Sequence, residues 1–158
     1  MKRRPRTKRH PVDEVDYETL ADLRYHIRRF LRTREEAARA AGIEPQQYLL
    51  LLQVRGLARL RPVTIGALAE RLQARHHAAV QLVDRLAERG MVRRRRAESD
   101  RRGVVIEITC RGAAVLRRLA LSSLTELRTE GPALAASLRR LSRRARAAPP
   151  TPRRRRPR

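Results

Sequence analysis

Apolar residues recur at helical spacing in the first part of the chain. A first stripe predicts a helix over about residues 16–41, and Gly42 is a favoured residue just past a helix end. Pro45 suits the first position of a second helix, which we expect over about 45–59. A run of leucines makes this second helix apolar on nearly all sides, which predicts a buried central helix. The first stripe comprises Leu20, Leu23, Ile27, Phe30, Leu31, Ala37, Ala38 and Ala41.

Two shorter amphipathic segments follow, joined by a tight turn. Thr64 is the predicted N-cap of a helix over residues 64–72, and a second helix covers about 75–89 and ends before Gly90. Each segment has one narrow apolar face. Two such helices separated by a short turn predict a helix-turn-helix.

After Gly90 the apolar spacing changes from the helical period to alternation. Residues 104–109 are the clearest strand, 91–96 are the expected partner strand, and a polar loop over 97–103 connects them. A β-hairpin that follows a helix-turn-helix is typical of a winged helix. The expected fold is therefore mainly α with a small β-hairpin wing.

From Gly112 the pattern is helical again, with a break predicted at Gly131-Pro132 before a last helix. Long amphipathic helices at both ends of a small domain leave apolar faces that a second copy of the chain would cover. We therefore expect residues 12–42 and 112–146 to be dimerisation helices that flank a DNA-binding part at 45–109.

The charge of the chain is strongly unbalanced. Its 158 residues suit one domain of ordinary size and carry a net charge of +23. Residues 1–11 and 147–158 are predicted to be disordered basic arms. Subtracting their 11 charges from +23 still leaves +12 for residues 12–146. Such a field favours a polyanionic partner such as nucleic acid and argues against an enzyme for small neutral substrates.

The sequence offers no support for an enzyme, a cofactor or a metal. It holds no phosphate-binding or dinucleotide-binding glycine loop, and the single Cys110 excludes a disulfide framework and a cysteine-based zinc site. No apolar run has the length of a signal peptide or a membrane span. We expect a cytoplasmic protein without a membrane partner.

The run ALAERLQARHHAAVQLVDRLAERGMVRRRRAESDRRGVVIEIT resembles the winged-helix signature of the MarR family, the multiple antibiotic resistance regulators. The specific parts are LAERL, then LVDRLAERGMV, then Asp100-Arg101-Arg102 followed by Ile108-Thr109, and the resemblance covers about residues 16–142. It implies a homodimeric bacterial transcription regulator at the nucleoid, most often a repressor. Many members release DNA when a small phenolic or lipophilic effector binds.

The predicted helix at 75–89 has side chains suited to a major groove. Arg can bond guanine, Gln can bond adenine, and Val can contact a thymine methyl group. Arg85 has the alternative of pairing with Asp84 or Glu88 on the surface. Neighbouring histidines on a helix point about 100° apart, which argues against a shared metal ion. The candidate base-reading residues are Arg75, His76, His77, Val80, Gln81 and Arg85.

The predicted wing is rich in arginine, which suits a narrow minor groove. The resemblance implies that Arg102 enters this groove, and Asp100 would hold that arginine extended. A solvated hairpin in a chain with arginine-rich coding is the alternative. The candidate wing contacts are Arg95, Arg96, Asp100, Arg101 and Arg102.

Three further residues have less definite roles. Tyr25 and His26 on the first helix are candidates for an effector cleft, with a partly exposed surface pair as the simpler alternative. Cys110 lies where a strand meets a helix, and either a redox switch or a small residue near the core would fit.

Two other functions compete with the sequence-specific regulator. An architectural protein that coats DNA with little sequence preference would use the same net charge and basic arms. A winged helix that binds RNA or protein would use the arms for RNA. The ratio of specific to non-specific DNA affinity separates the first two, and competition by RNA tests the third.

Overall fold

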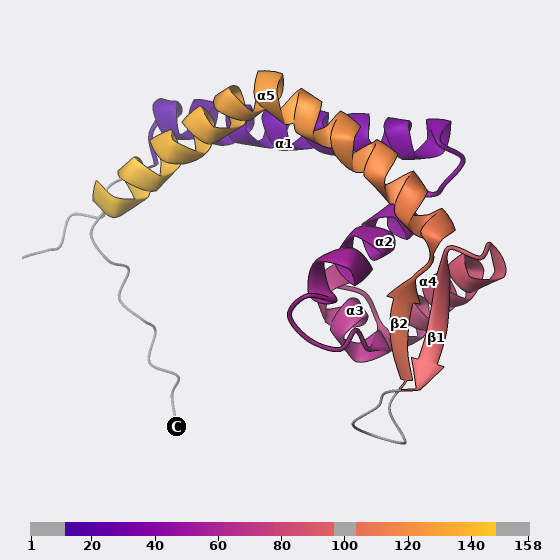
Figure 1. Ribbon diagram of the computed structural model, residues 1–158. Coiled ribbons are helices and arrows are strands. Elements are labelled where there is room, and N and C mark those ends of the chain that lie inside the picture. Colours follow the sequence, from indigo (N-terminus) through magenta and orange to yellow (C-terminus); the bar gives the residue numbers. More distant parts are fainter. Residues whose placement is uncertain (1–11, 97–103, 148–158) are drawn as a thin grey trace, which may run out of the picture. The chain divides into compact units, whose positions relative to one another are not determined.

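Helices and one antiparallel hairpin make up the structure, a computed structural model that describes residues 12–96 and 104–147 (Figure 1). This confirms the predicted mainly α fold with a β-hairpin wing. Two compact units divide the chain: Leu31–Glu126 forms one, and the segments up to Phe30 and from Leu127 form the other. The elements are α1 (Glu14–Ala40), α2 (Pro45–Leu57), α3 (Ile65–Leu72), α4 (His76–Glu88), β1 (Val92–Arg96), β2 (Val104–Ile108) and α5 (Cys110–Ala147).

Helix α2 lies at the centre of the Leu31–Glu126 unit. Leu50, Leu51 and Val54 have no exposed surface, and α2 contacts α3, α4 and β2. The expectation of burial on nearly all sides is wrong for two leucines, since Leu49 and Leu52 are 36% and 39% exposed. The helix is therefore covered over most of its surface but not all of it.

Polar contacts join α1, α2 and α5 inside this unit. Arg34 of α1 pairs with Glu126 of α5, and burial lowers the pKa of the Arg34 guanidinium. Tyr48 of α2 shares a hydrogen bond with Ser123 of α5, with 3.2 Å between the hydroxyl oxygens. Because buried charges and hydroxyls are costly unless they are paired, these contacts restrict how the three helices can pack.

The hairpin pairs β1 with β2 in antiparallel register, with Arg93 opposite Glu107 and Arg95 opposite Val105. The strict alternation expected for 104–109 is wrong at its start. Val105 and Ile106 are both buried, whereas Val104 is 44% exposed. The segment before α3 lies along the edge of β2, since the Ile106 N–H donates to the Val63 carbonyl.

Helix α5 is one continuous helix from Cys110 to Ala147, so the break predicted at Gly131-Pro132 is wrong. Proline removes a backbone hydrogen bond and crowds the preceding turn, but it is compatible with a helix that kinks or is held by its packing. The sequence shows that Gly131 and Pro132 disfavour a helix, but it does not show whether packing keeps the helix intact.

The first apolar stripe is only partly buried in the single chain. Ala38 has no exposed surface, but Leu20, Ile27 and Leu31 are between 40% and 49% exposed. The expectation was that a second copy of the chain would cover the spare apolar faces of the terminal helices. The structure shows that a single copy of the chain does not cover this stripe.

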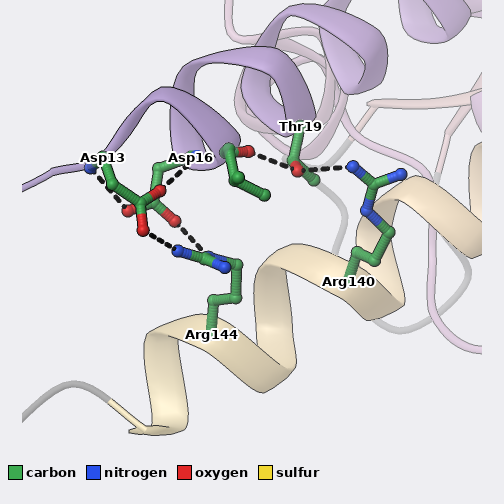
Figure 2. A network of polar contacts seen from close by, with 6 residues as sticks. Asp13, Asp16, Thr19, Arg140 and Arg144 are labelled. Carbon is green, nitrogen blue, oxygen red and sulfur yellow. Dashed lines mark hydrogen bonds and ion pairs between the residues drawn. The ribbon is translucent and has the colours of Figure 1, made fainter.

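In the second unit, the start of α1 and the end of α5 are joined by a polar network (Figure 2). The guanidinium of Arg144 donates to the carboxylates of both Asp16 and Asp13. Arg140 donates to the hydroxyl of the buried Thr19 at 2.9 Å, and that hydroxyl donates to the Val15 carbonyl at 2.7 Å. Two turns of α5 are thereby attached to the first turns of α1.

Gly112 offers a direct test of packing at the start of α5. A Cβ atom at this position would lie 2.1 Å from the Met91 carbonyl oxygen and 3.0 Å from the Ile108 side chain. We expect Gly112→Ala to lower the free energy of unfolding by about 1–3 kcal/mol, because backbone must move to make room. Urea unfolding measures this.

The matched control is Gly56→Ala, near the end of α2, where an added Cβ meets nothing within 4 Å. That variant should gain about 0.5–1 kcal/mol, since Ala is the better helix former. Equal effects of the two substitutions would contradict the close contact at Gly112.

Asp16 predicts a pH dependence of stability. Its hydrogen bond from Arg144, followed by the backbone hydrogen bond with Asp13, lowers the pKa of the Asp16 carboxyl in the folded chain. The resulting stabilisation is complete above the unfolded pKa of about 4 and is lost as pH falls towards the folded value. Asp16→Asn should therefore destabilise the chain at pH 7 and make progressively less difference below pH ~4.

Urea unfolding of both proteins across this pH range measures the effect. Glu18→Gln is the control, because Glu18 is an exposed carboxylate of the same helix. A loss for Asp16→Asn that stays constant down to low pH would show that the ion pair with Arg144 is not its cause.

Candidate nucleic-acid interface

The helix-turn-helix is formed by α3, a short turn and α4. Thr64 is the N-cap of α3, and its hydroxyl accepts a hydrogen bond from the Ala67 N–H at 3.2 Å. Gln73 ends α3 in the left-handed conformation with φ of 51°, which turns the chain within a few residues. Arg75 then precedes the first turn of α4 in an extended conformation.

The inner face of α4 fixes which side chains face outward. Ala79, Val83 and Leu86 are buried, so the opposite side of the helix points into solvent. His77, Gln81 and Arg85 follow one another at intervals of four and therefore share this outer face. The structure thus brings the candidate base-reading residues together around α4: Arg75, His76, His77, Gln81 and Arg85 are exposed, and Val80 is half-buried.

The wing is tied to α4 by an ion pair. Arg94 of β1 lies 2.5 Å from a carboxylate oxygen of Asp84 on α4. Asp84 was considered a surface partner for Arg85, but its carboxylate bonds the wing instead. This contact links the orientation of β1 to that of the helix beside it.

On the wing, one carboxylate bonds two arginines. Oε2 of Glu107 accepts from Arg93 Nε at 3.0 Å and lies 2.8 Å from its Nη2, and Oε1 accepts from Arg95 Nε at 2.6 Å. These hydrogen bonds, that from Arg95 first and that from Arg93 second, lower the pKa of the Glu107 carboxyl. Glu107 therefore remains ionised at neutral pH.

Asp84 and Glu107 are the site residues that the sequence reasoning missed. For Glu107 a signal was present, because a hairpin with strands at 92–96 and 104–108 places position 107 opposite position 93. For Asp84 the partner is on another element, and no spacing along the chain reveals it.

The predicted wing contacts are only partly covered by the structure. Arg95 lies on β1 and is bonded to Glu107, while Arg96 is exposed at the end of the strand. Asp100, Arg101 and Arg102 lie outside the described residues, as do the two basic arms, apart from the helical Ala147. Their roles remain predictions.

Tyr25 and His26 are neighbours on α1 with their rings edge to face, 5.4 Å between centroids. Tyr25 is 58% exposed, which fits a surface pair. A hollow of about 550 Å³ lies elsewhere, between residues 58–63 and the wing residues Arg95 and 105–107. Neither candidate residue lines it.

Cysteine, metal-binding and membrane-spanning features bear on other possible functions. Cys110 is exposed at the first position of α5. No group of His, Cys, Asp and Glu among residues 12–96 and 104–147 is arranged to hold a metal ion. Over the same residues, no helix has the length and apolar character that crossing a membrane requires.

A family model links this geometry to known proteins: residues 41–103 match the model of the MarR family. They include α2, α3, α4 and β1, the elements that place the candidate residues. The resemblance to the MarR family is thereby confirmed over this part of the chain. No curated protein matches the sequence.

Solved structures show that the chain has the fold of MarR family proteins. A MarR family transcription regulator has 20% identity and a TM-score of 0.67, with 87% of this chain and 92% of that chain covered. A MarR family protein from Bacillus stearothermophilus has 22% identity and a TM-score of 0.64, covering 85% and 98%. A mutant MarR from E. coli complexed with operator DNA has 22% identity and a TM-score of 0.59, covering 86% and 94%.

The N-cap of α3 gives a test of how this MarR-type helix-turn-helix is held. Thr64→Ala removes the acceptor for the Ala67 N–H. We expect the free energy of unfolding to fall by about 0.5–2 kcal/mol, because that donor loses its partner. Chemical unfolding gives the difference.

Thr64→Ser is the conservative control, since serine retains the hydroxyl, and it should remain close to the wild type. If serine and alanine were equally destabilising, the capping hydrogen bond would not be the source of the loss.

Proposed function

We propose that this chain, which resembles the MarR family, is a DNA-binding transcription regulator that reads an operator with the outer face of α4. The observation that carries the proposal is the grouping of Arg75, His77, Gln81 and Arg85 on an exposed face beside an arginine-rich wing. Arginine and glutamine are the side chains suited to the edges of guanine and adenine in the major groove. The complex of E. coli MarR with operator DNA, which shares this fold, supports the same reading.

We further propose that it acts as a homodimer. Large apolar side chains remain exposed on both long helices, including Leu20 and Ile27 on α1 and Leu121 and Leu124 on α5. A second copy would remove these surfaces from water. Two α4 helices related by a two-fold axis would then meet half-sites about 10 base pairs apart in a pseudopalindrome.

Repression and release by a small molecule are finer parts of the proposal. The family resemblance favours a repressor, and Tyr25 with His26 remains the candidate effector position. The arms and the wing loop would add phosphate and minor-groove contacts at the nucleoid. The net charge of +23 also keeps an architectural, weakly specific DNA-binding protein as the second candidate.

Fluorescence anisotropy tests the choice between them. DNA from upstream of the protein's own gene is compared with a scrambled duplex at several salt concentrations. If the upstream DNA contains the operator, a sequence-specific regulator should bind it at least ~1,000-fold more tightly than the scrambled duplex near physiological salt. Equal binding, followed by a genome-derived fragment selection without a preferred site, would favour the architectural protein.

Gln81 supplies the test at the level of one residue. Gln81→Ala should weaken binding to the preferred duplex by about 5- to 150-fold, the effect of losing one bidentate base contact. Binding to the scrambled duplex should not change. Gln46→Ala, at an exposed position of α2, is the matched control and should leave both affinities unaltered. Equal losses on both duplexes would argue against base reading by Gln81.

A further inference from the structure

The wing strand β1 carries four successive arginines, but it is less cationic than its sequence suggests. Arg94 points to Asp84 of α4, whereas Arg93 and Arg95 lie on the other face of the strand, where Glu107 is placed by the hairpin register. Both oxygens of the Glu107 carboxylate are occupied by guanidinium groups. Three of the four arginines therefore have a carboxylate partner within the protein.

We infer that Glu107 restrains the general affinity of the wing for DNA, because it bonds Arg93 and Arg95 and so competes with the phosphates of any sequence. This inference rests on the proposed DNA-binding function. A phosphate group that takes the Nε–H of either arginine has to displace Glu107, which accepts from both of these donors. Phosphate contacts carry no sequence information, so this competition weakens non-specific binding and leaves base reading by α4 unaffected.

The exposure of the three side chains shows why the competition is partial. Arg93 and Arg95 are 68% and 45% exposed, and Glu107 is 27% exposed. Ion pairs that water reaches are weak, so a phosphate can replace Glu107 when the rest of the interface fits. Arg59 and Arg61, which line the same hollow as Arg95 and Glu107, add positive charge around the carboxylate.

The experiment compares wild type and Glu107→Gln on the upstream and scrambled duplexes. Glu107→Gln should bind the scrambled duplex about threefold to tenfold more tightly near 0.1 M salt, as one or two phosphate contacts are gained. The slope of log affinity against log salt should steepen by about 0.9 for each contact. The preference for the upstream duplex should not fall, because on that duplex the wild type also gives up the bonds from Glu107 when these arginines contact phosphate.

Three variants make the result specific. Glu36→Gln is the charge-matched control, because Glu36 pairs with Arg32 on α1 at 2.8 Å, away from the wing. Glu36→Gln should bind the scrambled duplex with an affinity within ~2-fold of wild type. Glu107→Asp keeps the charge and should keep the affinity for the scrambled duplex closer to wild type than Glu107→Gln does. The gain from Glu107→Gln should disappear when Arg93→Gln and Arg95→Gln are also present.

The inference would be overturned if a folded Glu107→Gln protein bound the scrambled duplex with unchanged affinity. An equal gain in affinity for that duplex in Glu36→Gln would overturn it as well. Thermal unfolding establishes that the variants are folded. The proposed function has its own tests. It fails if the wild type binds neither duplex at low salt. It also fails if neither the upstream duplex nor fragment selection reveals a preferred site. If no preferred site is found, binding to the scrambled duplex still shows whether Glu107 lowers the affinity of the wing for DNA.

Discussion

The burial of α2 is the constraint on which the rest of the structure depends. Leu50, Leu51 and Val54 are completely covered, and so wide an apolar surface is stable only where other elements exclude water. Helices α3 and α4 and strand β2 provide that cover, so α2 dictates what their inner faces must be. Their outer faces are left free to carry polar and charged groups. This division explains how an aliphatic core and a strongly basic surface coexist in one small chain.

Local signals were sufficient for most of the fold. Thr64 and the glycines after α1 and α4 mark helix ends because capping and left-handed turns demand particular residue types. The errors arose where neighbours in space decide. Val105 is buried beside the equally buried Ile106, and Leu49 is partly exposed on the otherwise buried α2. Likewise, the proline at position 132 interrupts the expected pattern without ending the helix.

For the candidate site, sequence reasoning identified which helix presents polar residues but not how the wing's charges are balanced. Helical spacing alone places His77, Gln81 and Arg85 on one face, since buried residues fix the other. The bonds of Glu107 and Asp84 depend on side-chain direction and on contacts between elements. A count of charges treats every arginine alike. The structure shows that those of β1 differ according to the carboxylate each one meets.

Pro132 gives α5 uneven stiffness. A helix resists curvature partly because bending stretches its hydrogen bonds, and at proline one of these bonds is missing from the start. The carbonyl of Arg128, four residues earlier, receives no N–H from position 132, and Gly131 next to it has no side chain to brace the turn. The turn at residues 128–132 of this 38-residue helix is therefore held by one backbone hydrogen bond fewer than an uninterrupted turn. Bending of α5 would cost less there than in a turn that keeps all its hydrogen bonds.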